Sequence, residues 1–306
     1  MALQDLLKDL DPNELGLIVL SEDDLHNVQL QLEKMLHDFD EVCNKHNINW
    51  CLSGGSIIGA VRHNGFIPWD DDVDIFMTRK DYNAFRKVAI DELGDRYILK
   101  EPGRAGYIYH FPQLQLRHTE VGAIQTTDES NDGLFVDIFI LENAPNSKFI
   151  RILHGILCSF MLFIDSTVRQ KLCRDHIFRY AGKDTDTVRE VNKRAKFAFL
   201  FGFRKFENWL KSSDWVFAMC KNDNSKYVVC PSGRLHYFGE IYFREKMCRY
   251  TKHVFESHVW NIPEDYEYYL NKRYGSDYMT LPPIEKREKH LYVKLDLKSN
   301  SKGDIS

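Results

Sequence analysis

Residues 52–75 read LSGGSIIGAVRHNGFIPWDDDVDI, and two features of this stretch decide the fold. Near its start, Ser53-Gly54-Gly55-Ser56 separates the apolar residues 48–52, which predict a buried strand, from a short helix expected over 57–62. Near its end, carboxylates alternate with apolar residues, which predicts a second strand over 72–76. Together they indicate a combined site for phosphate and metal.

The acidic end of this stretch is unusually crowded, with Asp70, Asp71, Asp72 and Asp74 in close succession. Strand geometry directs residues 70, 72 and 74 to one face, with neighbours about 7 Å apart. Like charges at this spacing disfavour ionisation, and a cation relieves the repulsion. Hard oxygen ligands suit Mg²⁺ or Mn²⁺. We therefore predict a metal site at Asp70, Asp72 and Asp74; the alternative is a solvated acidic turn.

The glycine turn supplies the phosphate half of the predicted site. Glycine lets a ligand approach the backbone closely, and the N–H groups at the start of a helix attract anions. We therefore expect Gly54, Gly55 and Ser56 to hold a phosphate of the substrate. On its own, a Gly-Gly-Ser sequence also suits any tight turn.

A third acidic residue, Asp137, lies inside the apolar run LFVDIFIL of residues 134–141. A charged group in so apolar a strand needs a partner or a metal. Two functional roles follow: a third metal ligand, or the base that deprotonates an acceptor hydroxyl. The structural alternative is a carboxylate that bonds a backbone cap or an arginine.

The rest of the chain predicts alternating helices and short strands. Ser21 has the features of an N-cap, and apolar residues from 25 to 42 repeat at helical spacing up to an end near Asn47. Further on we expect a helix that opens at Thr78 or Asp81, strands at 97–99 and 114–116, a mostly helical segment over 148–220, short strands over 226–260, a helix over 263–274 that stops at Gly275, and a polar tail beyond Lys294.

The composition indicates a folded chain in a reducing compartment. Of its 306 residues, 43% are hydrophobic, and a net charge of −4 gives no general reason to expect nucleic acid as a partner. The first twenty residues do not predict a secretory signal, because they carry several charges. The seven cysteines are odd in number and share no CxxC spacing, which predicts isolated thiols; a zinc site built from distant Cys and His stays open.

The most apolar segment, residues 149–168, is broken by Arg151, His154 and Asp165. Its longest uncharged run is too short to cross a bilayer, so we expect no transmembrane segment. Two interpretations remain, a buried helix or a helix that rests on a membrane face.

Residues 52–75 resemble the signature of the LicD family, which includes bacterial phosphocholine transferases and animal fukutin-type ribitol-phosphate transferases within the nucleotidyltransferase superfamily. Residues 133–139 and 262–275, with Pro282-Pro283, are similar to later blocks of that family. The resemblance runs from about residue 25 to residue 290 and is weakest over 148–220. It departs from the family at Ile140-Leu141-Glu142, where many members have Pro-Leu-Asp, and we expect no membrane anchor such as the animal relatives have.

The resemblance implies an α+β fold: a nucleotidyltransferase-like mixed β-sheet core flanked by helices, with an inserted, mostly helical segment. We expect a catalytic core at 1–145, a helical insertion at 146–225, a C-terminal α/β part at 226–295 that completes the cleft, and a polar tail at 296–306.

The resemblance also implies the reaction. The enzyme would be cytoplasmic, and it could work at the inner face of the membrane, in peripheral contact with it. Its donor would be CDP-choline or another CDP-alcohol. It would pass the alcohol phosphate to a sugar hydroxyl of a glycan or lipid-linked oligosaccharide (teichoic acid, lipopolysaccharide or capsule) and release CMP. Asp72, Asp74, Asp137 and Asp70 would bind Mg²⁺ or Mn²⁺, and Asp137 could also activate the acceptor.

Further substrate contacts are expected around this centre. Arg62 is a candidate phosphate clamp because its planar fork suits phosphate oxygens, although a structural salt bridge to Asp70 is an equal alternative. Arg287 and His290 resemble a basic segment of the family near the active site. An aromatic cage for choline could draw on Tyr107, Tyr109, Phe111 or Tyr237, but we assign none, because most aromatic residues belong to the core.

Two rival functions stay open. The first is a nucleotidyltransferase that transfers the nucleotide itself and releases pyrophosphate. The second is a non-catalytic nucleotide-binding protein that has kept the fold, against which the presence of all three aspartates argues.

Overall fold

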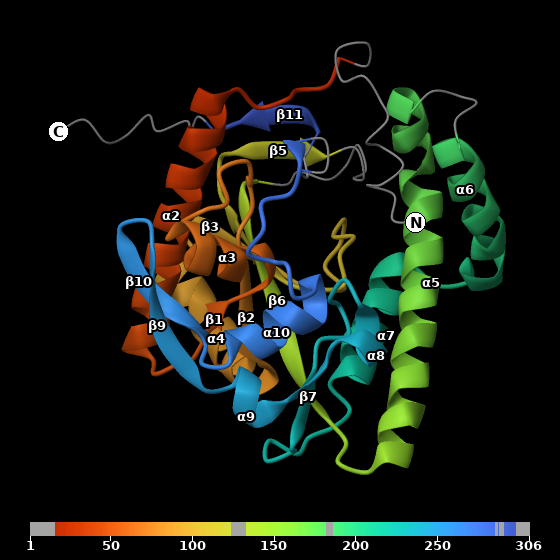
Figure 1. The fold of residues 1–306 in the computed structure, drawn as a ribbon. Helices are drawn as coiled ribbons and strands as arrows, with labels where there is room; N and C mark the ends of the chain where they lie inside the picture. Colours follow the sequence, from red (N-terminus) through yellow and green to blue (C-terminus); the bar gives the residue numbers. More distant parts are fainter. Residues whose placement is uncertain (1–15, 124–132, 182–185, 285–286, 288–290, 298–306) are drawn as a thin grey trace.

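The computed structural model describes residues 16–123, 133–181, 186–284, 287 and 291–297. Figure 1 shows a twisted mixed sheet between helices, with one long helix standing beside it. The α+β class that the sequence predicts is confirmed.

The main sheet has seven strands, with the order β1-β2-β6-β4-β3; β7 pairs with the last residues of β6, and β8 pairs with β7. Only β2 and β6 run parallel; the other pairs are antiparallel. The strands are β1 Cys51–Leu52, β2 Asp74–Thr78, β3 Tyr97–Lys100, β4 Gln113–Leu116, β6 Phe135–Ala144, β7 Tyr227–Val229 and β8 Ile241–Phe243. Two small antiparallel sheets pair β9 Tyr250–Phe255 with β10 His258–Pro263, and β5 Glu120–Ala123 with β11 Tyr292–Asp296.

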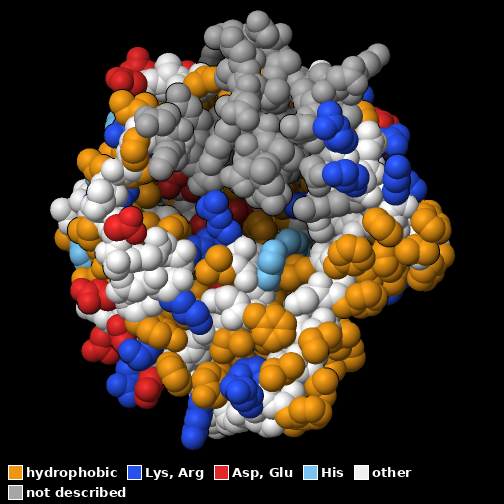
Figure 2. All heavy atoms as spheres, turned by 45° about the vertical axis from the view of Figure 1, so that its right-hand side comes forward, with side chains coloured by type: hydrophobic (Ala, Val, Ile, Leu, Met, Phe, Trp, Pro, Cys, Tyr) orange, Lys and Arg blue, Asp and Glu red, His pale blue; other side chains and the backbone are white. Residues whose placement is uncertain are grey.

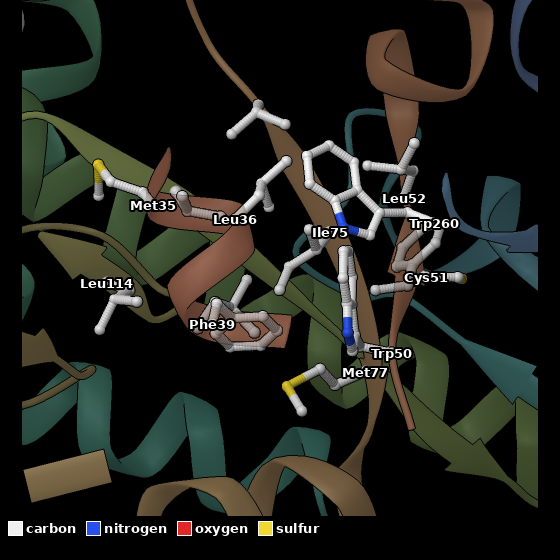
Figure 3. Packing of buried hydrophobic residues seen from close by; sticks show 14 of the residues in the cluster. Met35, Leu36, Phe39, Trp50, Cys51, Leu52, Ile75, Met77, Leu114 and Trp260 are labelled. Carbon is white, nitrogen blue, oxygen red and sulfur yellow. The ribbon is translucent and has the colours of Figure 1, made fainter. Parts of the chain in front are cut away.

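Helices α2 (Glu22–Lys45) and α4 (Arg79–Leu93) cover one face of this sheet. Both begin at caps that the sequence predicts: Ser21 accepts the N–H of Asp24, and Thr78 accepts the N–H of Asp81. Figure 3 shows how side chains of α2 meet those of the strands. Phe39 packs edge-on against Trp50, with ring centroids 5.4 Å apart, and both side chains are buried. This face is the main hydrophobic core.

The opposite face carries α3 (Gly54–Ile58), which continues into the π-helix η1 (Gly59–His63), and α10 (Tyr266–Tyr274). The Tyr269 ring of α10 packs edge-on against Phe76 of β2 at 5.6 Å. Side chains alternate along β2, so Asp74 shares this face with Phe76, whereas Ile75 and Met77 enter the main core.

A second core lies between the long helix α5 (Lys148–Ala181) and its helical neighbours. These are α6 (Asp186–Ala195), the 3₁₀ helix η2 (Lys196–Phe201), α7 (Phe206–Phe217) and α8 (His236–Gly239); α9 (Arg244–Met247) follows β8. Cys158, Met161 and Ile164 of α5 are buried there. By length and composition α5 could cross a membrane, which the charges within residues 149–168 did not lead us to expect, and 39% of its most apolar window is buried. One side of the helix is buried in this core, and the other side is uncovered.

Several predicted boundaries shift. Strand β1 begins only at Cys51, and β2 begins only at Asp74. Asp70, Asp71 and Asp72 therefore lie in the segment before β2. Helix α3 starts at Gly54, which places both glycines in its first turn. Pro263 belongs to β10, and α10 begins at Tyr266. Lys294, after which we expect a polar tail, lies within β11. This strand pairs with β5, and local periodicity cannot predict a pairing between segments so far apart in the sequence. All seven cysteines are free, as expected.

Candidate active site

Two carboxylates lie side by side where the parallel strands begin. The register pairs Asp74 of β2 directly with Asp137 of β6, and the N–H of Asp137 donates to the carbonyl of Val73 at 3.1 Å. Directly paired residues on neighbouring strands point to the same face, about 4.8 Å apart in the backbone. The structure therefore brings Asp137 beside Asp74, as the predicted site requires.

Asp74 is the most strongly perturbed group of this cluster. Burial raises its pKa well above the usual value, and the negative charges of Asp72, Asp137 and Asp70 raise it further, while Arg273 opposes them. Asp70 and Asp72, from the segment before β2, thus act on the same carboxyl group as Asp137. Three negative charges therefore act on one carboxyl group, and a cation placed among them would relieve their repulsion.

The two glycines of α3 lie directly against these carboxylates. A Cβ added at Gly54 would come within 2.6 Å of Asp74 Oδ2, and one at Gly55 within 3.2 Å of Asp70 Oδ2. Gly54 also has a φ of +53°, a conformation that glycine adopts most readily. Ser56 Oγ accepts the N–H of Asp74 at 3.0 Å. All three residues that we expect to hold phosphate therefore line the acidic cluster.

A buried pair of glutamines, which the sequence argument missed, positions Asp137. Gln113 Nε2 donates to Asp137 Oδ1 at 2.7 Å, and Gln115 Nε2 donates to Gln113 Oε1 at 2.8 Å. Both glutamines are buried, and the N–H of Gly133 donates to Gln115 Oε1 at 3.3 Å. The available signal was their alternation with Leu114 and Leu116 in β4, which marks a polar face inside a buried strand.

Arginine 273 of α10 lies on the other side of the cluster. Arg273 Nη1 forms an ion pair with Glu240 Oε1 at 2.7 Å, and Glu240 is fully buried. Arg273 Nε is buried and has no hydrogen-bond partner among the residues that the structure describes. One turn earlier, Tyr269 Oη accepts the N–H of Gly54 at 3.1 Å. Helix α10 thus fixes the start of α3 and places a positive charge near Asp74.

Arg62 and Arg287, the two arginines that we expect to contact the substrate, make different contacts in the structure. Arg62 Nη1 donates to the carbonyl of Tyr278 at 2.8 Å, so its guanidinium holds the segment after α10. The Arg287 guanidinium stacks over the Trp69 ring at 4.0 Å and therefore lies beside the segment that carries Asp70. His290 falls outside the described residues.

Aromatic side chains extend away from Asp137 on the same face. The ring of Phe139, two residues further along β6, lies 4.9 Å from that of Phe111, and Tyr109 follows at 5.7 Å from Phe111. Tyr107 contacts Tyr109 at 5.5 Å. Tyr237 is elsewhere, buried in the second core. Tyr107, Tyr109 and Phe111 thus form a run that ends at Phe139, two residues from Asp137 in β6.

The donor chemistry of the cluster suits Mg²⁺ or Mn²⁺, because every candidate ligand is a hard carboxylate oxygen and Asp74 is half-buried among like charges. Across the described ranges, however, no group of three or more His, Cys, Asp or Glu residues is arranged as a metal site. Figure 2 shows acidic side chains deep in a hollow, with a basic and a histidine side chain at its rim.

Comparison with known proteins agrees with this geometry. Residues 47–152, which include Asp72, Asp74 and Asp137, match the family model described as LicD/FKTN/FKRP, nucleotidyltransferase domain. The chain is 28% identical over 272 residues to the lipopolysaccharide cholinephosphotransferase LicD of Haemophilus influenzae, which covers 87% of this chain and 95% of that protein. An uncharacterized protein of Rickettsia prowazekii is 27% identical over 122 residues, covering 39% of this chain and 42% of that protein.

Proposed function

Because residues 47–152 belong to the LicD family of nucleotidyltransferase domains, we propose that this protein is a phosphotransferase with a CDP-activated donor. It moves phosphocholine, or another alcohol phosphate, to a sugar hydroxyl of a cell-surface glycan and releases CMP. Lipopolysaccharide is the first acceptor to test, since the relative from Haemophilus influenzae is named for it; teichoic acid and capsule follow.

The observation that carries this proposal is the parallel register of Asp74 and Asp137. Asp72, Asp74, Asp137 and Asp70 would hold Mg²⁺ or Mn²⁺. When bound, the metal supplies charge neutralisation at the pyrophosphate of the donor. The residues of the chain do the rest: they orient the donor, position the acceptor and take up its proton.

Asp137 would act as the general base. Its Oδ1 accepts a hydrogen bond from Gln113, which would hold the carboxylate for an acceptor hydroxyl that approaches from the same sheet face. The acceptor oxygen forms a bond to the phosphorus that carries choline, the bond from this phosphorus to the oxygen of CMP breaks, and the acceptor proton passes to Asp137.

The surrounding residues would hold the donor. The start of α3, with Gly54, Gly55 and Ser56, would take a phosphate, and Arg273 offers a guanidinium whose Nε has no partner among the described residues. The aromatic run that ends at Phe139 would lie against the quaternary ammonium of choline. The seven free cysteines suit the reducing cytoplasm, where CDP-activated donors would be used.

The test is a donor screen. CDP-choline, CDP-ribitol, CDP-glycerol and CDP-ethanolamine are incubated with the protein, Mg²⁺ and lipopolysaccharide or teichoic acid. We expect CMP release, with the labelled alcohol phosphate on the glycan. A nucleotide attached to the acceptor with release of pyrophosphate would replace the proposal by a nucleotidyltransferase, and donor binding without turnover would replace it by a nucleotide-binding protein.

A further inference from the structure

The long helix α5 exposes a continuous stripe of large apolar side chains. Phe149, Leu153, Ile156, Phe160 and Phe163 recur at helical spacing on the side opposite the second core. All five are exposed, and Phe149 reaches 71%. A helix that served only the core would carry polar residues on this side, so the stripe needs a further explanation.

The stripe continues onto neighbouring elements. The Phe163 ring contacts Phe201 of η2, with centroids 6.3 Å apart, and beyond it Phe199 and Phe203 are 73% and 80% exposed. On α8, the exposed Phe238 lies so close to Gly155 of α5 that a Cβ there would meet its ring at 2.6 Å. We name these exposed side chains of residues 149–163, 197–203 and 238 the apolar face.

Figure 2 shows this concentration of hydrophobic side chains on the right and lower parts of the molecule. Exposed apolar surface of this extent marks an interaction site in soluble proteins. The remaining question is what covers it.

The segments that carry the apolar face contain charged residues of one sign. Residues 148–164, 196–206 and 231–239 contain no Asp or Glu, although the chain as a whole is acidic with a net charge of −4. The same segments carry basic residues: Lys148, Arg151, Lys196, Arg204, Lys205 and Arg234. Aromatic and aliphatic side chains that share their segments with cations alone are complementary to an anionic lipid surface. A second copy of this face would bring like charges together, which disfavours a dimer.

Helix α5 is also fastened to the domain, which argues against its crossing a bilayer. His154 Nε2 bonds the carbonyl of Val216 at 2.8 Å, and its Nδ1 bonds Tyr237 Oη at 3.1 Å. The buried Asp165 lies in the same helix. A spanning α5 would expose these polar groups to lipid; a helix in the plane of the interface keeps them inside the protein.

We propose that the apolar face docks the protein on an anionic lipid bilayer, with α5 lying in the plane of the membrane surface. The docking itself is independent of the reaction, but its purpose rests on the proposed function. Segment 237–240 connects the apolar face with the candidate active site: Phe238 belongs to the apolar face, and Glu240 forms an ion pair with Arg273, which lies near the carboxylates. Docking would bring the site to a glycan acceptor that is carried on lipid.

The experiment is flotation of the full chain with vesicles of phosphatidylcholine, with and without phosphatidylglycerol. We expect binding to the anionic vesicles that weakens as salt is added. The paired variant F199S/F203S and the charge variant K148E/R204E/K205E should each bind roughly tenfold more weakly or worse. Matched changes on α4, I90S and K87E, should bind as the parent does, since Ile90 and Lys87 are exposed far from this face. Circular dichroism checks that each variant is folded.

The outcomes separate docking from catalysis. Docking is supported if the face variants no longer bind vesicles but still release CMP with a soluble glycan fragment as acceptor. The variant D137N should float with the vesicles and release no CMP. Flotation of a chain that turns over no donor leaves docking intact and removes only the proposed function. Absence of flotation, binding unaffected by the face variants, a dimer that hides the face, or association that resists carbonate extraction overturns docking.

Discussion

Asp74 in β2 and Asp137 in β6 are directly paired residues of two parallel strands, and this pair is the centre of the candidate active site. A parallel pair cannot be joined by a hairpin; here α4, β3, β4 and β5 lie between its two strands in the sequence. A slip of one residue in the register would turn Asp137 into the core. The position of the two carboxylates is therefore a property of the whole sheet.

Replacing Asp74 by Asn should abolish transfer and stabilise the metal-free protein. The variant loses a metal ligand and also removes a carboxyl group that burial and its neighbours hold in an unfavourable state. We expect CMP release to fall at least about 10³-fold and the melting temperature in EDTA to rise. The exposed Asp91→Asn on α4 is the control and should change neither. Near-normal turnover in Asp74→Asn would refute the site.

The difference in unfolding free energy between the wild type and Asp74→Asn should depend on pH in a defined direction. Because the folded-state pKa of Asp74 is raised, the contribution of this carboxyl to stability is most favourable where it is protonated in both states, below about pH 4. Above that pH the carboxyl ionises first in the unfolded chain, so its contribution falls until the folded-state pKa is passed. The advantage of Asp74→Asn should therefore grow as pH rises from 4, measured by urea unfolding in EDTA. A constant difference across this range would contradict it.

Metal addition should reverse the instability of the wild type. Millimolar Mg²⁺ or Mn²⁺ should raise its melting temperature and support turnover, and EDTA should remove both effects. Because the pKa of Asp74 is raised, protons compete with the metal for this carboxyl, so the metal-induced shift should shrink as the pH is lowered. Scanning fluorimetry of the wild type and Asp137→Asn makes the comparison; an equal shift in the variant would place the metal elsewhere.

Substituting Gly54 tests the close approach of α3 to the carboxylates. Gly54→Ala must adopt a φ of +53° and place its Cβ within 2.6 Å of Asp74 Oδ2. Gly106→Ala meets the same backbone strain, at φ +74°, but has open space around its Cβ. Both should lose roughly 1 kcal/mol of stability from strain. Only Gly54→Ala should also lose turnover, by about tenfold or more, because Asp74 must move. Equal activities would show that Gly54 serves the turn alone.

Replacing Gln113 by Leu should lower kcat more than it changes KM. The substitution removes the donor that orients Asp137 and leaves Gln115 without its acceptor. We expect kcat to fall about 10- to 100-fold, as for other groups that position a ligand or base, and stability to fall by about 1–3 kcal/mol. Steady-state kinetics with the best donor give the comparison. A loss of stability with kcat unchanged would make the glutamines purely structural.

Local patterns determined much of this structure. The N-cap of α2, the helix stop at Gly275 and the strand around Asp137 lie where the sequence predicts them, and Thr78 is one of the two predicted starts of α4; the strand predicted over 72–76 begins only at Asp74. Each depends on residues close together in the chain, such as a capping side chain or an alternation of period two or 3.6. The motif of residues 52–75 was specific enough to indicate the family as well.

Tertiary structure decided which of these residues meet. The sequence could not show that Gln113 would hold Asp137, that Arg273 would come beside Asp74, that β5 would pair with β11, or that one side of α5 would remain uncovered. Periodicity reports which face of an element is apolar, but the partner of each face depends on register and packing between distant segments. The sequence shows which carboxylates are present, and the pairing of the strands in the sheet brings them close together.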